Sequence, residues 1–273
     1  LLARYPERTG AMIEVIKSID DLARQKWDVL VPTMGALHIG HKTLIELAKK
    51  EGERVIVSIF VNPLQFENKE DLINYPKSLD SDIKLAEAAG ASALFTPSED
   101  VIYPGDIEKI PTGRIGEIYE GASRAEHFSG VLTVVKRLFD LVKPKAAVFG
   151  EKDFQQLFLI KQMVAHLKIP VQIISAPTIR DNAGLAVSSR NIKLGSDGEK
   201  KAQVIHRALT KQTFEQMQKE ISSEPGFKLD YLEVIDENSF EKAKTGTQNK
   251  RVIIAGWVNQ IRLIDNMPMG NQQ

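Results

Sequence analysis

The sequence predicts an α/β fold: a Rossmann-like parallel sheet with helices on both faces, followed by a smaller C-terminal α+β domain. Two observations support this prediction. Short apolar runs alternate with helical periodicity as far as about residue 176, which is typical of a parallel sheet covered on both faces. After about residue 194 a long polar helical stretch precedes the last strand-like runs. We therefore expect a Rossmann-like domain over residues 12–190 and a lid-like domain over residues 191–273.

The expected elements follow one another along the chain. The strands of the parallel sheet are expected at Val29–Pro32, Arg54–Val61, Ala93–Thr96, Ala146–Gly150 and Val171–Ala176. Helical periodicity lies between them near residues 41–51, 78–89, 130–142 and 154–167. In the C-terminal domain we expect a helix over about residues 199–220 and strands at Leu229–Asp236, Arg251–Val258 and Arg262–Asp265. Ligands of open parallel sheets bind outside the carboxyl ends of the strands, so the turns after these strands are candidate sites.

Composition excludes several classes of protein. The 273 residues include no cysteine, which excludes a disulfide scaffold, a thiolate metal site and a cysteine nucleophile, and fits a cytoplasmic location. The 36 acidic and 36 basic residues balance, so we expect no nucleic-acid partner. No apolar run reaches the roughly 18 residues that a membrane span needs, so we expect no membrane partner. Residues 1–11 precede Met12 and contain no site motif, and we interpret them as a tag or extension.

The strongest motif is the turn Pro32–His41, which follows an expected strand and opens an expected helix. A helix N-terminus offers unpaired N–H groups and a partial positive charge, which favour phosphate. The glycines of the turn let backbone and phosphate approach closely, and His38 and His41, three residues apart, can face the same side. The alternative is an ordinary turn with incidental histidines. Two of only five histidines fall here, which favours the phosphate site.

A second strand-to-helix turn, Gly150–Asp153, carries a lysine and an aspartate. The ammonium of Lys152 can balance negative charge that develops on phosphate, and Asp153 is a plausible N-cap residue. The alternative is an exposed lysine at a helix start, which is common. The polar segment Ser188–Arg190, near the expected domain boundary, offers hydroxyls and a guanidinium that suit a leaving anion, and its alternative is a polar loop.

Neutral amides also stand at strand ends. Gln65 and Gln156 can each donate one hydrogen bond and accept another without bringing a charge to the site. They are therefore candidates for binding a polar ligand. The alternative is a pair of turn-forming amides.

Several of these motifs together carry a family resemblance. His38-Ile39-Gly40-His41 is the HIGH signature of the nucleotidylyltransferases and class I aminoacyl-tRNA synthetases. The segments at residues 57–66 (VSIFVNPLQF), 149–157 (FGEKDFQQL), 188–191 (SSRN) and 262–266 (RLIDN) follow in order. With them the chain resembles the pantothenate synthetase (pantoate–β-alanine ligase) family over nearly its whole length from Met12. The resemblance implies that ATP activates pantoate as a pantoyl adenylate, that β-alanine displaces AMP to give pantothenate, and that the enzyme uses Mg²⁺ and forms a homodimer.

The resemblance also implies roles for individual residues. His41 is the expected proton donor, with His38 beside it and Lys152 on the phosphates. Gln65 and Gln156 are expected to bind pantoate, with Asn62 beside them. Asp82 matches a family aspartate linked to Mg²⁺, with a charge in the first turn of a helix as the alternative. The residues expected to bind ATP are Met34, Gly35, Ala36, Leu37, His38, Ile39, Gly40, His41, Gly150, Glu151, Lys152, Asp153, Ile179, Val187, Ser188, Ser189 and Arg190.

One segment departs from the family pattern. Ala125 and Glu126 stand where proline and glycine are common, which replaces a rigid and a permissive backbone position. The substrate-side role that the family gives to Arg124 and His127 therefore stays open. Two other functions remain as alternatives: another HIGH-motif nucleotidylyltransferase or truncated tRNA synthetase, and a non-catalytic ATP-binding regulatory protein on the same fold.

Overall fold

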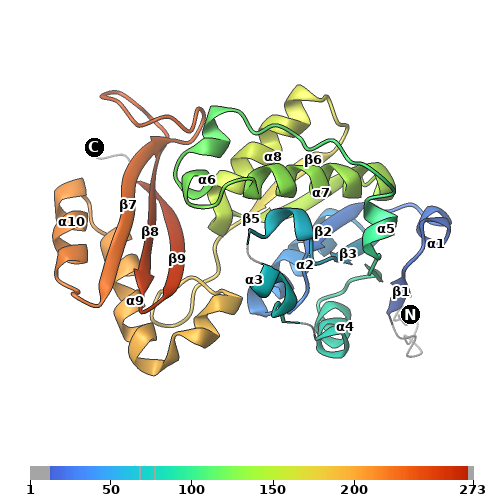
Figure 1. Cartoon of the computed structure of the whole chain (residues 1–273), viewed down its shortest axis with the longest axis horizontal. Coiled ribbons are helices and arrows are strands. Elements are labelled where there is room, and N and C mark those ends of the chain that lie inside the picture. Colours follow the sequence, from blue (N-terminus) through green and yellow to red (C-terminus); the bar gives the residue numbers. More distant parts are fainter. Residues whose placement is uncertain (1–12, 68, 77, 270–273) are drawn as a thin grey trace, which may run out of the picture.

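A six-stranded parallel sheet forms the centre of the larger part of the molecule (Figure 1). The computed structural model describes residues 13–67, 69–76 and 78–269, so the expected extension over residues 1–11 lies outside it. The strands are β1 (Glu14–Ile16), β2 (Val29–Thr33), β3 (Val55–Ile59), β4 (Ala93–Phe95), β5 (Ala146–Gly150) and β6 (Gln172–Ala176). Their order across the sheet is β1-β4-β3-β2-β5-β6. The predicted fold class is confirmed.

Helices cover both faces of this sheet (Figure 1). One face packs against α2 (Ile39–Glu51) and α4 (Leu79–Ala88). The other packs against α1 (Ile19–Ala23), α5 (Glu99–Ile102), α7 (His127–Val142) and α8 (Phe154–His166). Val29 and Val31 of β2 face the first layer and Leu30 faces the second, because successive side chains of a strand point to opposite faces. This two-sided burial explains why the strands are continuous apolar runs.

Shorter elements connect the strands and helices. They are η1 (Pro63–Gln65), α3 (Lys69–Ile73), η2 (Arg114–Glu117), α6 (Glu120–Ser123), η3 (Glu151–Asp153) and η4 (Ser189–Lys193). Three of them, η1, η3 and η4, carry residues that the sequence assigns to the site. Among the described residues, none of the helices combines the length and the apolar character needed to cross a membrane.

The chain direction across the sheet reverses between β2 and β5. From β2 the chain adds β3 and β4 on one side, and β5 then pairs with β2 on the other side, with Val29 opposite Ala146. The turns that follow β2 and β5 therefore lie beside each other at the carboxyl edge. In open α/β sheets this switch point is where ligands bind.

A second, antiparallel sheet forms the C-terminal part (Figure 1). It contains β7 (Phe227–Asp236), β8 (Lys250–Val258) and β9 (Ile261–Met269), and it follows α9 (Gly195–Leu209) and α10 (Phe214–Ser222). Val252 and Ile254 of β8 pack against these two helices. Ile253, on the opposite face, packs in a cluster with Phe158 of α8. Both faces of the small sheet are thus used, one for its own core and one for attachment to the larger part.

The structure differs from the expected elements at one strand and one helix. The sequence analysis omits β1, which has only three residues and lies at the edge of the sheet, too short for a period to be visible. The expected helix over residues 199–220 is instead two helices, α9 and α10. The break occurs because Thr213 begins a new helix with a capping box, in which its hydroxyl accepts from Gln216 N–H and the Gln216 side chain accepts from Thr213 N–H.

Gly130 of α7 lets that helix approach η1 very closely. A Cβ atom at this position would overlap the carbonyl group of Leu64 and lie 2.8 Å from the backbone nitrogen of Gln65. Gly130 O also accepts a hydrogen bond from the side chain of Asn62. This contact therefore sets the position of η1 and of the glutamine at its end.

We expect Gly130→Ala to lower the free energy of unfolding by about 1–3 kcal/mol, because the added methyl group overpacks the contact. If Gln65 binds a ligand as the sequence predicts, the KM for that ligand should also rise. Chemical denaturation and steady-state kinetics measure the two effects. Asp140→Ala, on the exposed side of the same helix, is the matched control and should change neither. Unchanged stability in Gly130→Ala would show that η1 is free to move away.

Candidate active site

A cavity of about 290 Å³ lies at the carboxyl edge of the parallel sheet, beside β2 and β5. It is bounded by the turn after β2, by η1, by the turn after β5 and by η4. The structure therefore brings together motifs that are more than 150 residues apart in the chain. Most residues predicted for the site line this cavity: Met34, His38, Gly40, His41, Asn62, Gln65, Gly150, Lys152, Asp153, Gln156, Ile179, Val187, Ser188, Ser189 and Arg190.

Asp82 of α4 holds the turn after β2 from behind. Its carboxylate accepts hydrogen bonds from Ala36 N–H at 3.0 Å, from Leu37 N–H at 2.7 Å and from the Ser78 hydroxyl at 3.1 Å. The turn needs this support because Gly35 and Ala36 both have left-handed backbone conformations, with φ of 84° and 51°. The Asp82 side chain is only 1% exposed. This buried carboxylate already has three partners in the protein, which favours a structural role over the expected contact with Mg²⁺.

Backbone hydrogen bonds fix the tautomer of each of the two histidines in the turn. His38 N–H donates to His41 Nδ1 at 3.2 Å, and Gly40 N–H donates to His38 Nδ1 at 3.1 Å. Because both Nδ1 atoms accept from the backbone, the proton of each neutral ring is on Nε2. Both rings line the cavity, and their centroids are 4.1 Å apart. The turn thus provides two side-chain N–H donors in addition to its backbone N–H groups.

Burial keeps both rings neutral. It lowers the pKa of His41 to about 3, with His38 as the next contribution, and it lowers the pKa of His38, with the charge of Lys152 as the second cause. A positive charge on either ring is disfavoured because the ring is removed from water and faces another cation. In the free protein, the pair therefore acts at neutral pH as uncharged hydrogen-bond donors.

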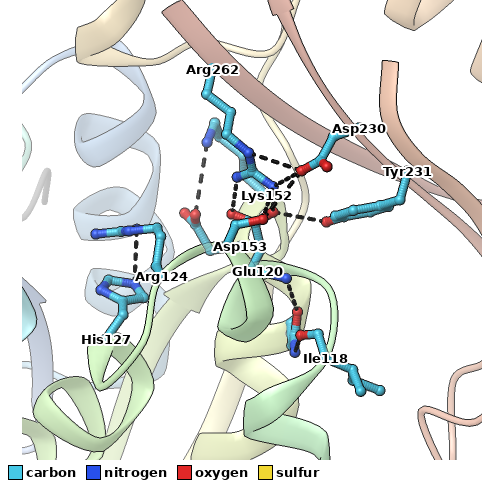
Figure 2. Close-up of polar contacts among 11 residues, drawn as sticks. Ile118, Glu120, Arg124, His127, Lys152, Asp153, Asp230, Tyr231 and Arg262 are labelled. Atoms are coloured by element: carbon cyan, nitrogen blue, oxygen red, sulfur yellow. Dashed lines mark hydrogen bonds and ion pairs between the residues drawn. The ribbon is translucent and has the colours of Figure 1, made fainter. Parts of the chain in front are cut away.

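The turn after β5 places Lys152 and Asp153 at the same cavity (Figure 2). Lys152 Nζ lies 3.8 Å from the Asp153 carboxylate, and its side chain is 19% exposed. Asp153 occupies the N-cap position of α8 as expected, but its side chain makes no capping hydrogen bond. Its recessed position would raise the pKa of Asp153, but Lys152, Arg190 and other nearby cations outweigh this effect and lower it. The carboxylate and the ammonium are both charged and available to a ligand.

The amide of Gln65 is oriented by Asn62. Leu64 N–H donates to Asn62 Oδ1, and Asn62 Nδ2 donates to Gly130 O, which fixes the orientation of the Asn62 amide. The same Nδ2 donates to Gln65 Oε1 at 3.0 Å, and Tyr103 OH donates to Asn62 Oδ1 at 2.8 Å. Both ends of the Asn62 amide therefore have partners in the protein, which favours a positioning role over the expected direct contact with a ligand. Among the described residues, Gln65 Nε2 donates only to the Met34 sulfur, a weak acceptor, at 3.0 Å.

Two neighbouring glutamines of α8 have different environments. Gln155 is buried and donates to the carbonyls of Ile115 and Ile118, while its Oε1 accepts from Glu120 N–H. It braces η2 and α6. Gln156 lines the cavity instead. The structure thus distinguishes the ligand-facing glutamine from the structural one, as the sequence analysis expects for Gln156.

Arg124 and His127, whose role the sequence leaves open, also line the cavity (Figure 2). The tautomer of His127 follows from its two hydrogen-bond partners. Gln65 O can only accept, so His127 Nδ1 donates to it at 3.1 Å, and His127 Nε2 accepts from Arg124 at 3.0 Å. Burial, followed by the charge of Arg124, lowers the pKa of His127 to about 4. Glu126 keeps the left-handed conformation that glycine usually adopts, with φ of 62°, and its side chain pairs with Lys109.

Some residues predicted for the site do not line the cavity. Gly35, Ala36 and Leu37 form the turn beneath it, and the side chain of Ile39 is 52% exposed. Glu151 faces the C-terminal sheet, where its carboxylate lies 3.3 Å from Arg251. Adjacent residues in a turn point in different directions, which a motif alone does not reveal.

A cluster of charges to which the sequence analysis gave no role links the C-terminal sheet to α6 (Figure 2). Arg262 of β9 donates to both carboxylate oxygens of Glu120 at 2.7 Å and to Asp230 at 2.7 Å. Tyr231 OH donates to Glu120 at 3.0 Å. These ion pairs outweigh the effect of burial and raise the pKa of Arg262 above its usual value. Tyr75, which the sequence analysis also did not single out, lines the cavity with its aromatic ring. It belongs to no sequence motif that would have identified it.

The described residues provide no ready-made metal site. Within residues 13–67, 69–76 and 78–269, no group of three or more His, Cys, Asp or Glu side chains is arranged to hold a metal ion. Asp82, the expected ligand, is buried behind the turn. The donor set of the cavity is dominated by N–H groups, which suit anions.

Comparisons with known proteins give one consistent result. The family model described as pantoate-beta-alanine ligase matches residues 8–268. The chain is 44% identical over 255 residues to the pantothenate synthetase of Acidothermus cellulolyticus, which covers 88% of this chain and 84% of the relative. The crystal structure of pantothenate synthetase from Thermus thermophilus superposes with a TM-score of 0.90 at 37% identity, covering 94% of this chain and 99% of the other. Pantoate-beta-alanine ligase from Francisella tularensis, complexed with beta-gamma ATP and beta-alanine, gives a TM-score of 0.80 at 39% identity, covering 94% and 98%.

We expect Asp82→Asn to weaken ATP binding about ten- to a hundredfold without changing the Mg²⁺ requirement. The amide can accept only one of the two backbone hydrogen bonds, and losing a bond to a charged group costs about 1.5–3 kcal/mol. Calorimetric titration with ATP and activity against Mg²⁺ concentration measure the two quantities. Asp80→Asn, an exposed carboxylate in the first turn of the same helix, is the control. A raised Mg²⁺ requirement with normal ATP binding would restore the metal role.

The lowered pKa of His127 predicts a pH dependence of stability. Between pH 6.5 and about 4 the unfolded chain binds a proton that folded His127 does not, so the free energy of unfolding falls as the pH falls. The loss from this residue reaches at most about 3 kcal/mol. Denaturation at several pH values should give a shallower dependence for His127→Gln, with His41 still contributing. His166→Gln, an exposed helical position, should keep the wild-type slope, and an equal slope in all three proteins would contradict the prediction.

Proposed function

The chain belongs to the pantoate–β-alanine ligase family and ligates pantoate to β-alanine with ATP, and we propose that the cavity beside β2 and β5 performs both steps of this reaction. The observation that carries this assignment is the convergence of the HIGH turn, Lys152 and the two glutamines on one cavity. The cavity offers N–H donors that suit phosphates and side-chain amides that suit a hydroxy acid.

In the first step, the pantoate carboxylate attacks the α-phosphorus of ATP. A bond forms between this oxygen and phosphorus, and the bond to the bridging oxygen of the β-phosphate breaks, so pyrophosphate leaves with the electron pair. Negative charge increases on the leaving group. The Nε2–H groups of His38 and His41 and the ammonium of Lys152 stabilise this charge, and we assign the proton donor role to His41.

In the second step, the amine of β-alanine attacks the acyl carbon of pantoyl adenylate. The new carbon–nitrogen bond replaces the acyl–oxygen bond to AMP, AMP leaves, and the nitrogen loses a proton. Arg124 lies beside His127 on the wall nearest the C-terminal sheet, where its guanidinium suits a carboxylate. The adenylate would hydrolyse in open water, so the C-terminal domain, divided from the catalytic domain near residues 190 and 191, acts as a lid.

Pantoate fits the chemistry of the two glutamines and the apolar residues that line the cavity. It carries two hydroxyls, a carboxylate and two methyl groups on one carbon. Gln65 Nε2 can donate to it, because Asn62 holds the Gln65 oxygen away, and Gln156 supplies a second amide. The apolar side chains of Val131, Val134 and Leu138 line the same cavity and suit the methyl groups.

The remaining parts of the proposal concern metal, assembly and location. Mg²⁺ enters with ATP as Mg·ATP, because triphosphate oxygens and water satisfy its coordination without a protein cage. The homodimer and the cytoplasmic location stay predictions, the first testable by sedimentation. Other HIGH-motif nucleotidylyltransferases would release the nucleotide adduct as product, and a regulatory ATP-binding protein would show no turnover.

A separable adenylation step is the central test. With pantoate and Mg·ATP but no β-alanine, labelled pyrophosphate should exchange into ATP, because the adenylate forms reversibly on the enzyme. The reaction without pantoate is the control and should show no exchange. Exchange that requires β-alanine would exclude an isolated adenylate.

We expect Gln156→Ala to raise the KM for pantoate about ten- to a hundredfold, since a lost hydrogen bond to a buried ligand group costs about 1–3 kcal/mol. The KM for ATP should change little. Gln162→Ala, on an exposed position of the same helix, is the matched control. Equal increases for both substrates, together with a lower melting temperature, would indicate structural damage instead.

A further inference from the structure

The turn that carries Lys152 is held by the C-terminal sheet. Asn266 of β9 donates from Nδ2 to the carbonyl of Glu151 at 2.8 Å and to the carbonyl of Lys152 itself at 2.9 Å. These two hydrogen bonds join residues more than 110 positions apart in the chain. Asn266 is 4% exposed, so water does not readily replace it.

Arg251 of β8 fixes the orientation of this amide. Its guanidinium donates to Asn266 Oδ1 at 2.5 Å, which leaves the NH₂ group directed at the two carbonyls. The guanidinium also contacts the Glu151 and Glu237 carboxylates and stacks over the Phe154 ring at 4.0 Å. Asn266 is therefore held with one polar end toward the C-terminal domain and the other toward the turn.

The turn has little support of its own from side chains. Gly150 precedes η3 without a side-chain cap, and Asp153 makes no capping hydrogen bond at the start of α8. The Asp153 carboxylate instead faces Lys152 at 3.8 Å. The backbone under Lys152 is thus braced from the other domain.

We propose that Asn266 is a positioning residue for Lys152, so that the phosphate-binding ammonium is in place only when the C-terminal sheet is docked against η3. This inference rests on the proposed role of Lys152 in adenylation. It gives the C-terminal domain a second task besides covering the site: it completes the charge arrangement for the first step. A misplacement of about 1 Å at a reacting group can cost about a hundredfold in rate.

The test is a double-mutant cycle on the full-length enzyme. Pyrophosphate–ATP exchange with pantoate is measured for wild type, Asn266→Ala, Lys152→Ala and the double variant. Ligation of supplied pantoyl adenylate with β-alanine is measured for the same four proteins. Asn266→Ala should slow exchange about ten- to a hundredfold and slow the amine step much less, because the amine step releases no pyrophosphate. In the Lys152→Ala background the same substitution should change exchange by less than about twofold.

Two further variants separate position from stability. Ile221→Ala removes a buried side chain from the core of the C-terminal domain, far from η3, and should lower the melting temperature while keeping the wild-type ratio of the two half-reactions. Asn266→Ser keeps one hydrogen-bond donor and removes less volume than Asn266→Ala does. It should lose less of the exchange rate than Asn266→Ala, and it serves as the test variant if the alanine protein does not fold.

Each negative outcome has a distinct meaning. If Lys152→Ala leaves exchange unchanged, the proposed catalytic role of Lys152 is wrong and this inference is overturned with it. If Lys152→Ala slows exchange but the losses of the two variants multiply, Asn266 acts independently of Lys152 and only this inference is overturned. Equal slowing of both half-reactions in Asn266→Ala would likewise overturn it, since that would mean a general loss of structure.

Discussion

The parallel pairing of β2 with β5 is the constraint on which the rest of the site depends. It places the ends of two strands, 117 positions apart when Val29 is opposite Ala146, beside each other at the switch point of the sheet. The groups assigned to the phosphates follow these two strands: His38 and His41 come after β2, and Lys152 comes after β5. The apolar residues that bury both faces of β2 thus determine where the chemistry can occur, and some of them, such as Val131 and Leu138, also line the cavity.

Backbone support at this edge comes from behind each turn. The carboxylate of Asp82 satisfies two N–H groups of the left-handed segment after β2. Asn266 satisfies two carbonyls of the turn after β5. One bracing residue comes from a helix of the same domain and the other from the second domain. Strained or weakly capped turns keep one geometry only when neighbouring elements hold them in this way.

The sequence predicts the strands of the sheet and the residues of the turns better than it predicts the directions of single side chains. Strands buried on both faces, such as β5, have a continuous apolar pattern, and the predicted bounds of β5 are those found. The motifs named the residues at the turns because phosphate chemistry restricts their types. The directions of Glu151, Asn62 and Asp82 were not predictable, because each depends on a partner distant in the chain. The bracing by Asn266 and Arg262 depends on docking of two sheets, which no local pattern encodes.

The pKa of His41 depends on the charges that surround its ring. Without ligand, the burial of His41 and the cations near it keep its ring neutral, with a pKa of about 3. A bound triphosphate places several negative charges beside the same ring, and a nearby opposite charge raises the pKa of a histidine. If the triphosphate binds there as proposed, the pKa of His41 would rise toward the range in which the ring can share a proton with the phosphates. The same low starting pKa that makes the ring an uncharged donor in the free enzyme prevents it from being protonated before ATP arrives.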